Sequence, residues 1–476
     1  MLKRLTAVLL VILLVLSCFG IGEAAAWKRL KKGSRGDEVR ILQTELKNLG
    51  YYSGKIDGIY GKGTVNAVKA FQRKNGLKAD GIAGPLTQAK LYENKAQAAP
   101  AALAEAASET GTDTAQEPAA ASAVPDRALS FLQGIQKSSG AVCGTVVLSK
   151  EGKVFLNWSF GGVDDNTCFR IASVTKWVTA IGLMTLYDQG KLDLDKDISS
   201  YLGYKVRNPA FPDTPVTARM LLSHTSSLSP DASDYHPDWA RIGKKGYDPV
   251  FNESVKPGTQ YAYADYNGAL FGCLIEAISG QSVQNYMSRT VFRPLGLTAG
   301  YSPNFLPPGT KCKDLLNKNG KVEISVTKDR NRTYNNKADP KGNNGYTVGK
   351  LYINAVSLTR LARMMYNGGE LDGVRILKSA TVQLMESDQK LLAESPYGLS
   401  TVRLNQYDRG TWYGHQGRYS GLSSKIYYQR ETGITMALIM DGYDYALQDN
   451  IVMPAVSILR NMEKLEEICL GNTTAN

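Results

Sequence analysis

A serine and a lysine three positions apart, Ser173 and Lys176, form the pattern in this chain with the clearest chemical use. Residues with this spacing lie on one face of a helix, with Cβ atoms about 5–6 Å apart. A serine hydroxyl attacks a carbonyl carbon only when a neighbour takes its proton, and a desolvated lysine amine does this. The pattern therefore predicts a serine nucleophile with a lysine as its base.

The same tetrapeptide recurs at 325–328, so its surroundings must select the functional copy. Ser173 opens an apolar stretch, 177–187, that predicts a buried helix of about three turns. A serine in the first turn lies where backbone N–H groups and the helix dipole favour a developing anion. The second copy runs into the polar stretch 329–336, which predicts a loop. A third match, 387–390, lacks an apolar helix after it. Context therefore favours Ser173.

Tyr263 and Asp265 lie just before a second apolar helical stretch. A tyrosine near a serine and a lysine can relay protons. Taken alone, the segment around Tyr263 is equally well interpreted as a turn rich in aromatic residues.

His415 and Gly417 precede two predicted strands, 424–428 and 434–440, joined by a turn. Glycine at 417 would let a substrate backbone approach the strand closely. A lone histidine is more often structural than catalytic. The chain has three histidines and no His-Glu-x-x-His pattern, which argues against a zinc amidase, and we expect no metal and no organic cofactor.

Residues 1–26 predict an export signal, because two basic residues precede an apolar run over 5–16 and small residues at 24–26 offer a cleavage site before Trp27. The run is shorter than the roughly 20 residues of a membrane span. We expect a secreted chain with no stable membrane span after cleavage. Lipidation at Cys18 and a retained anchor are the alternatives.

Five cysteines remain after cleavage, and they are widely spaced and odd in number. A chain of this size buries a core without a disulfide framework, so most are interpreted as small buried hydrophobes. One bridge is compatible with export, and at least one thiol stays unpaired.

Composition divides the mature chain into three parts. Residues 27–95 are basic, with fifteen Lys or Arg against six Asp or Glu. Residues 96–125 contain thirteen Ala and three Pro, and their only charges are four acids, which predicts a flexible linker. Residues 126–476 are long enough for one large domain. The basic part would suit an anionic wall polymer or nucleic acid, and export favours the wall over nucleic acid.

The basic part contains an internal repeat, since an Asp-Gly turn at 57–58 and Thr64 recur at 80–81 and Thr87. Each Asp-Gly predicts a turn and each threonine a helix N-cap. Helical spacing of apolar residues before and between the turns predicts a compact three-helix unit.

Residues that carry a family pattern are spread over almost the whole of 30–91: Gly33, Gly36, Leu42, Gln43, Gly50, Tyr51, Asp57, Gly58, Thr64, Phe71, Gln72, Asp80 and Gly81. With them the segment resembles the peptidoglycan-binding domain found on many wall hydrolases. Peptidoglycan is therefore the expected partner, and we expect the secreted chain to be wall-associated.

In chain order, Ser-x-x-Lys at 173–176, Tyr-x-Asp at 263–265 and His-x-Gly at 415–417 resemble the three elements of the serine β-lactamase and penicillin-binding-protein superfamily, in its class C-like branch of DD-peptidases and esterases. The resemblance spans roughly 126–465. It implies an α+β fold, in which helices flank an antiparallel sheet and an all-helical region adds the other wall of a cleft. Patterning agrees, with strands expected at 141–148 and 153–160 and a terminal helix at 451–465.

The resemblance also implies roles. Ser173 is the nucleophile, Lys176 and Tyr263 exchange its proton, and His415 completes the wall of the site. Backbone N–H groups of Ser173 and Arg418 form the oxyanion hole, beside Asp265 and Gly417 as substrate-binding positions. His224, in the segment 221–228 that also fits the branch, is interpreted as structural and outside the site.

Two departures limit the assignment of substrate. Asp265 stands where the superfamily usually has asparagine, and an ionised carboxylate only accepts hydrogen bonds. His415 replaces the lysine of typical β-lactamases, so a permanent charge for a substrate carboxylate is missing unless the Arg418 side chain turns inward. We expect a D-alanyl-D-alanine carboxypeptidase-type peptidase on peptidoglycan peptides, with β-lactams as further ligands. A β-lactamase, a D-specific esterase or aminopeptidase, and a non-catalytic wall-binding protein or penicillin sensor are the alternatives.

Overall fold

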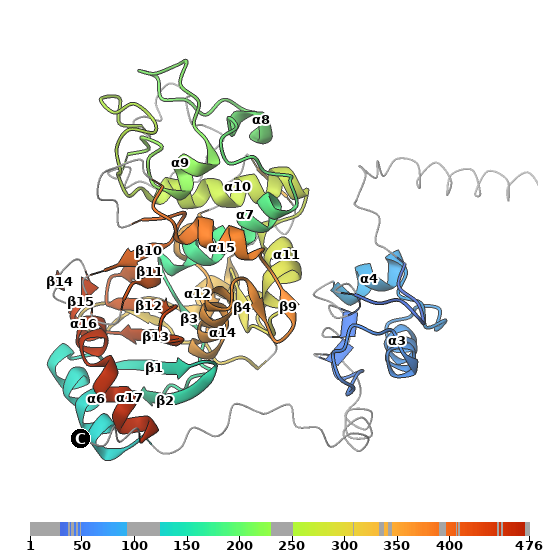
Figure 1. Ribbon diagram of the computed structural model, residues 1–476, viewed down its shortest axis with the longest axis horizontal. Coiled ribbons are helices and arrows are strands. Elements are labelled where there is room, and N and C mark those ends of the chain that lie inside the picture. Colours follow the sequence, from blue (N-terminus) through green and yellow to red (C-terminus); the bar gives the residue numbers. More distant parts are fainter. Residues whose placement is uncertain are drawn as a thin grey trace, which may run out of the picture. The chain divides into compact units, whose positions relative to one another are not determined.

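The chain forms two compact units, residues 1–113 and 114–476 (Figure 1). The computed structural model describes residues 29–36, 39, 42–43, 46–47, 49–92, 124–229, 251–307, 309–332, 338–340, 345–389, 397–405, 407, 410–444, 447–448 and 451–471. The predicted export signal, Cys18 and most of the predicted linker lie outside these residues. Within the described part, no helix has the length and apolar character needed to cross a membrane.

The smaller unit is built from α3 (Lys62–Lys74), α4 (Pro85–Tyr92) and helical residues at 39, 42–43 and 46–47. Its core is apolar, with Val39, Val68 and Phe71 among the fully buried side chains. The predicted repeat has a structural counterpart, because two buried glutamines each bind one Asp-Gly turn in the same way.

Gln43 donates to Asp57 at 2.9 Å and to Thr64 at 3.0 Å, and its Oε1 accepts the N–H of Gly58 at 2.9 Å. Gln72 repeats this set with Asp80, Thr87 and Gly81 at 2.9, 3.0 and 2.8 Å. The two threonines serve this network and do not cap helices, so the N-cap prediction is wrong. The N-cap of α3 is Gly61, without a side-chain hydrogen bond.

The larger unit contains a six-stranded sheet in the order β10-β11-β12-β13-β1-β2, in which every neighbouring pair is antiparallel. Its strands are β1 (Cys143–Lys150), β2 (Lys153–Phe160), β10 (Val402–Leu404), β11 (Trp412–Tyr419), β12 (Leu422–Gln429) and β13 (Ile434–Asp441). Short strands lie outside this sheet: β3 (Phe169–Arg170), β4 (Ala299–Gly300), β5 (Leu315–Leu316), β6 (Val322–Ile324), β7 (Tyr352–Ile353), β8 (Glu370–Leu371), β9 (Val374–Arg375), β14 (Leu447–Gln448) and β15 (Ile451–Val452).

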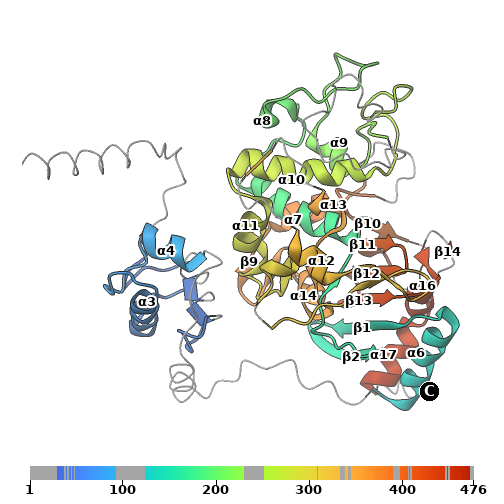
Figure 2. The ribbon, with the colours of Figure 1, turned by 180° about the vertical axis from the view of Figure 1, so that it is seen from behind.

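Helices cover both faces of the sheet (Figure 2). On one face, α6 (Asp126–Ser139), α16 (Met453–Arg460) and α17 (Met462–Leu470) pack on one apolar cluster, and on the other face α14 (Ala355–Tyr366) packs on β12, β13 and β1. Side chains of a strand alternate between the two faces, so each strand contributes to both cores.

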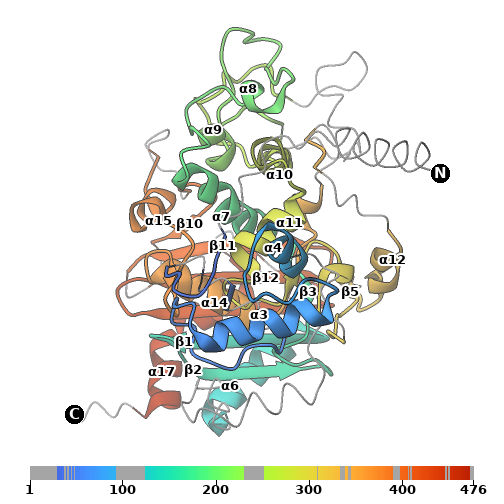
Figure 3. The ribbon, with the colours of Figure 1, turned by 90° about the vertical axis from the view of Figure 1, so that its right-hand side faces the viewer.

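The helical region lies at the end of the unit away from α6 and α17 (Figure 3). Its two longest helices, α7 (Val174–Asp188) and α10 (Asp265–Ser279), pack against each other and are buried along most of their length. The remaining helices are α8 (Ser199–Leu202), α9 (Ala218–Leu222), α11 (Val283–Met287), α12 (Val326–Asn331), α13 (Tyr346–Gly349) and α15 (Ser379–Glu386), with a π-helical turn at Ser288–Phe292 and a 3-10 turn at Pro303–Phe305.

The predicted α+β class is confirmed, and the predicted strands correspond to β1, β2, β12 and β13. Two local predictions are wrong. The terminal segment forms β15 and two helices, α16 and α17, because the helix is interrupted at Asn461. The second Ser-x-x-Lys copy forms α12 instead of a loop, because Ser325 caps that helix by accepting the N–H of Thr327.

Candidate active site

Ser173 stands at the N-terminus of α7, directly after a strained residue. Ala172 is buried and has φ of +45°, a conformation that costs a non-glycine residue about 1–3 kcal/mol. Neighbouring elements fix this bend, since Ser424 of β12 donates to the carbonyl of Ile171 at 2.7 Å. The Ser173 hydroxyl does not cap its own helix. The turn therefore presents the hydroxyl to the region between α7, α10 and β11.

Lys176 is fully buried one turn into α7, and its ammonium group lies at the centre of the site. Nζ lies 3.0 Å from Ser173 Oγ, 2.9 Å from the carbonyl oxygen of Val348 and 2.6 Å from Asp265 Oδ1. Burial lowers the pKa of Lys176, but Tyr263 and Asp265 raise it by more, so the net shift is upward. Lys176 is therefore protonated in the resting site and donates to Ser173.

Tyr263 lies in the extended segment before α10, with Lys176 Nζ 5.4 Å from the centre of its ring. Its hydroxyl is buried and makes no hydrogen bond to the described residues. Asp265 is the first residue of α10 and remains partly exposed. The structure thus brings together four predicted site residues: Ser173, Lys176, Tyr263 and Asp265.

His415 is buried in the middle of β11 and hydrogen-bonds through both ring nitrogens. Nδ1 lies 2.7 Å from the carbonyl oxygen of Gln416, which can only accept, so the proton sits on Nδ1. Nε2 then accepts from the hydroxyl of Tyr397. Burial, assisted by the charge of Lys176, lowers the pKa of His415 to about 3, so the ring is neutral.

Gly417 touches the nucleophile's own backbone. A methyl group at this position would lie 2.4 Å from the carbonyl oxygen of Ile171 and 2.9 Å from the nitrogen of Ser173. Glycine is therefore required for the approach of the protein's own chain, whereas the sequence pointed to the approach of substrate. The same approach brings the backbone of β11 beside the Ser173 N–H group.

Arg418 follows on β11 with an exposed side chain. Because side chains alternate along a strand, it belongs to the face opposite Gly417, where it lowers the pKa of the buried Lys425 together with burial. The Arg418 side chain therefore does not supply the missing charge beside Ser173.

Two aromatic side chains that sequence reasoning did not place in the site adjoin Tyr263. Tyr397 lies 6.4 Å from it between ring centres, and His224 stacks on it at 4.2 Å. His224, interpreted from the sequence as a structural residue of a connecting turn, does lie in the turn after α9, and there it stacks on a proposed site residue. Two features of the sequence could have placed His224 near the site. The segment 221–228 already fitted the superfamily, and the chain has only three histidines.

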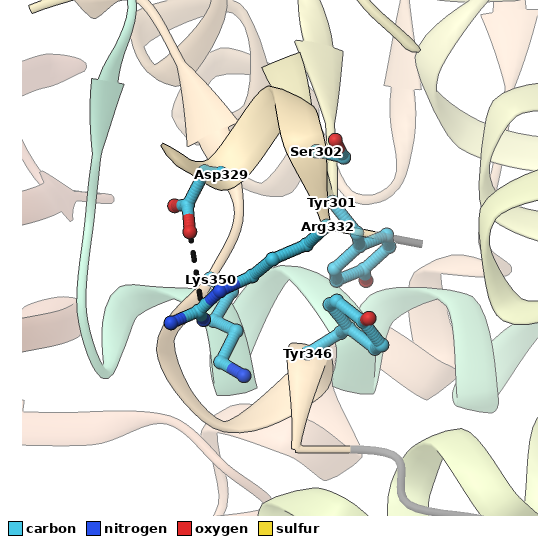
Figure 4. Close-up of a pocket in the computed structure, with 6 residues that line it drawn as sticks. All are labelled: Tyr301, Ser302, Asp329, Arg332, Tyr346 and Lys350. Atoms are coloured by element: carbon cyan, nitrogen blue, oxygen red, sulfur yellow. Dashed lines mark ion pairs between the residues drawn. The ribbon is translucent and has the colours of Figure 1, made fainter. Parts of the chain in front are cut away.

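A small pocket lies beside α13, the helix that also carries Val348, whose carbonyl oxygen accepts from Lys176 (Figure 4). Its charged centre is Asp329 of α12, which lies 3.5 Å from Arg332 and 3.7 Å from Arg170 and accepts from Tyr352. Burial and the two arginines lower the pKa of Lys350 to about 8. The pocket is lined by Tyr301, Ser302, Asp329, Arg332, Tyr346 and Lys350. Since Ser173 is not among these residues, we interpret the charged side chains of the pocket as an ion cluster that supports the fold.

Comparison with known proteins places this geometry in a family. Residues 129–450 match the family described as "Beta-lactamase", and residues 35–91 match the one described as "Putative peptidoglycan binding domain". The chain belongs to the beta-lactamase family. The predicted resemblance, a beta-lactamase and penicillin-binding-protein type domain behind a peptidoglycan-binding domain, is confirmed at this level.

Relatives are distant. "Penicillin-binding protein 4*" of Bacillus subtilis (strain 168) is 23% identical over 328 residues, which are 60% of this chain and 64% of that protein, so the chain spans less than two thirds of this relative.

Solved structures share the fold. The octameric penicillin-binding protein homologue from Pyrococcus abyssi has a TM-score of 0.56 at 20% identity, covering 73% of this chain and 77% of its own. The D-amino acid amidase from Ochrobactrum anthropi SV3 has a TM-score of 0.54 at 19% identity, covering 72% and 99%. At these identities the likeness supports the fold alone.

Among the described residues, no group of three or more His, Cys, Asp or Glu side chains could hold a metal ion.

Proposed function

We propose that this member of the beta-lactamase family is an exported, wall-associated serine hydrolase that forms an acyl-enzyme at Ser173 and removes D-alanine from peptidoglycan stem peptides. The observation that carries the proposal is the contact of 3.0 Å between Lys176 Nζ and Ser173 Oγ at the start of a buried helix. Lys176 is fully buried, and the Ser173 hydroxyl makes no helix-capping hydrogen bond. This arrangement is suited to acyl transfer.

The protonation state of Lys176 sets the first step. In the resting site the ammonium group donates to Ser173, so it cannot accept the serine proton until it has lost one of its own. Asp265, at 2.6 Å, is the nearest acceptor. The neutral amine then takes the proton of Ser173 as the hydroxyl attacks the carbonyl carbon. Such proton transfer contributes about 10²–10⁴ in rate.

Tyr263 has the role of proton donor to the leaving group in this scheme. Its hydroxyl is buried, makes no hydrogen bond of normal geometry to the described residues and adjoins Lys176. The backbone N–H groups of Ser173 and Arg418 bind the oxyanion, which is worth on the order of 3 kcal/mol for each donor. Water then releases the acyl group. His415 is neutral and is held by Tyr397, so its role is to shape the wall through hydrogen bonds.

The peptidoglycan-binding domain supports the choice of stem peptides, because it concentrates the catalytic domain at the wall. Hydrolysis of D-amino-acid amides or esters is the second candidate. The carboxylate of Asp265 favours it, because a partly exposed carboxylate beside the nucleophile would attract a substrate with a free ammonium group.

Intact-mass measurement after exposure to a penicillin tests the site. We expect an adduct of one penicilloyl group on the wild type and none on Ser173→Ala. An adduct that persists in Ser173→Ala would contradict the assignment of the nucleophile. Release of D-alanine from acyl-D-Ala-D-Ala, compared with turnover of nitrocefin and of a D-amino-acid amide, then identifies the substrate class. Absence of both adduct and turnover would favour a non-catalytic wall-binding protein.

A further inference from the structure

The hydroxyl of Tyr263 must be placed from its ring and backbone. It makes no hydrogen bond of normal geometry to the described residues, and the interaction that remains at its polar end is with the Lys176 ammonium group. The segment that carries it precedes α10 and is extended, with Ala264 at φ −129° and ψ 132°. A misplacement of about 1 Å in a reacting group can cost about 10² in rate. The contacts of the Tyr263 ring and of its two neighbours therefore determine where the hydroxyl lies.

The turn after α9 supplies these contacts through His224. The imidazole is fully buried and stacks on the Tyr263 ring, with centres 4.2 Å apart and planes inclined by 25°. The His224 carbonyl accepts the N–H of Ala262 at 2.8 Å, and Nδ1 accepts the N–H of Ala264 at 3.2 Å. One residue thus holds the ring of Tyr263 and the N–H groups of the residues before and after it.

A second layer orients the imidazole. Asn267, in the first turn of α10, lies 2.9 Å from His224 Nδ1 through its amide nitrogen, and its oxygen accepts from Ser226 at 2.6 Å. Nδ1 therefore accepts two hydrogen bonds, and the ring proton sits on Nε2. Burial, with the charge of Lys176 acting in the same direction, holds the pKa of His224 well below its usual value, so the ring stays neutral.

The geometry of His224 carries costs that a purely structural residue would not require. Its φ is +54°, which costs about 1–3 kcal/mol. Its Nε2 is buried without a hydrogen-bond partner among the described residues, and a buried orphan donor costs about 1–3 kcal/mol. An apolar residue in the turn would avoid the second cost. Such a residue could not hold both Tyr263 and the N–H of Ala264.

We propose that His224 is a positioning residue for the reaction at Ser173: it fixes the ring of Tyr263 and the N–H groups of its neighbours Ala262 and Ala264, so that the phenol hydroxyl faces the Ser173–Lys176 pair. The inference rests on the proposed acyl transfer. It assigns to His224 no contact with substrate and no proton transfer.

Two substitutions separate the two contacts of His224. His224→Phe keeps a ring for stacking and removes the acceptor, whereas His224→Asn keeps an acceptor close to Nδ1 and removes the stack. We expect each to lower the rate constant of acylation by a penicillin about 10–100-fold, with the dissociation constant of the preceding non-covalent complex changed less than threefold. Ser223→Ala, in the same turn with its hydroxyl bound to Arg219, is the matched control and should leave both constants unchanged.

The decisive measurement repeats His224→Asn in a Tyr263→Phe background. If His224 acts through the Tyr263 hydroxyl, the second substitution lowers the rate less than threefold further. Losses that multiply, or wild-type rates in both single variants, would overturn the proposal. Ser226→Ala, which releases Asn267 and leaves the histidine, is expected to slow acylation about threefold and keeps the test available if the histidine variants unfold.

The outcome for the proposed function can be distinguished from this one. A wild-type protein that is never acylated contradicts the assignment of Ser173 and says nothing of His224. In that case the crystal structure of His224→Asn decides: a displaced Tyr263 ring supports the positioning role, and an unmoved ring overturns it.

Discussion

The ion pair of Lys176 and Asp265 is the residue-scale feature that distinguishes this site. An ammonium group that is fully buried would ordinarily lose its proton, because burial disfavours the charged form. Here the carboxylate at 2.6 Å and the nearby tyrosine outweigh burial and raise the pKa of Lys176. Lys176, the residue proposed as the base, is therefore protonated in the resting site. The fraction of Lys176 in the neutral amine form should limit the rate of acylation at neutral pH.

Asp265→Asn should consequently make the site active at lower pH. The opposite charge of Asp265 favours the ammonium form of Lys176, so removing it lowers the pKa of Lys176. We expect the acidic limb of the pH profile for penicillin acylation to move to lower pH. Asp195→Asn, at a surface ion pair with Arg219, is the control. An unmoved limb would mean that Lys176 does not control acylation.

The sequence could predict residues that carry chemistry but not those that hold them. Ser173, Lys176, Tyr263 and His415 have side chains whose types indicate catalysis, and their order matched a family pattern. Tyr397 and His224 contact that group only because distant segments meet: Tyr397 enters beside β10, and His224 at a turn with positive φ. No periodicity or spacing encodes such meetings. Even the reason for Gly417 depends on a contact with Ile171, distant in sequence.

At the scale of elements, strand β11 carries a buried neutral histidine, which couples its stability to pH. The pKa of His415 is lowered to about 3, whereas an unfolded histidine titrates near pH 6.5. As pH falls between these values, the unfolded chain binds a proton that the folded domain does not. The stabilisation is complete above about pH 6.5 and declines below it, by about 1.4 kcal/mol per pH unit.

His415→Gln removes the imidazole that binds a proton in the unfolded chain, so it should flatten the pH dependence of the unfolding free energy. Other buried groups also titrate, including Asp441 with a pKa raised to about 6 by burial, so the informative quantity is the difference between variant and wild type. From urea unfolding between pH 6.5 and 5, we expect the slope of unfolding free energy against pH to be smaller in the variant by about 1 kcal/mol per pH unit on average. Equal slopes would show that His415 is protonated in the folded domain.

In the small unit, the repeated element is a buried glutamine bound to an Asp-Gly turn. Helical spacing and the turns were readable in the sequence, but the role of the threonines was not. A threonine before a helix suggests a cap, whereas Thr64 and Thr87 lie inside their helices and bind Gln43 and Gln72. A polar side chain buried in a small core leaves no signature other than its repetition.

Gln72→Leu should therefore destabilise the small unit by about 2–4 kcal/mol, because the N–H of Gly81 and the oxygens of Asp80 and Thr87 lose their partner. Amide hydrogen exchange of the full chain should show faster exchange at Gly81, with the amides of α7 unaffected. Lys78→Ala, at an exposed position, is the control. Protection at Gly81 equal to wild type would contradict the role of the glutamine.

At the scale of the whole molecule, the chain has two compact units with separate cores, and the proposed function assigns binding to the first and catalysis to the second. The first matches a peptidoglycan-binding family and is basic, and the second carries the Ser173 site. A binding domain tethered to a catalytic domain raises the effective substrate concentration without changing the active site. Its contribution should therefore appear with an insoluble wall and disappear with a small soluble substrate.

Deletion of the first unit tests this division. We expect residues 114–476 to hydrolyse a soluble acyl-D-Ala-D-Ala peptide at the rate of the full chain, because no residue of the proposed site is removed. On purified wall sacculi at low concentration, release of D-alanine should fall about 10–100-fold, and the truncated protein should stay in the supernatant while the full chain pellets. Since part of the attraction of a basic unit is electrostatic, the full chain's advantage should shrink as salt rises from 0.05 to 0.5 M, roughly the range over which the Debye length falls below 10 Å. Equal release from sacculi by the two proteins would remove the targeting role and leave the first unit without a function in this reaction.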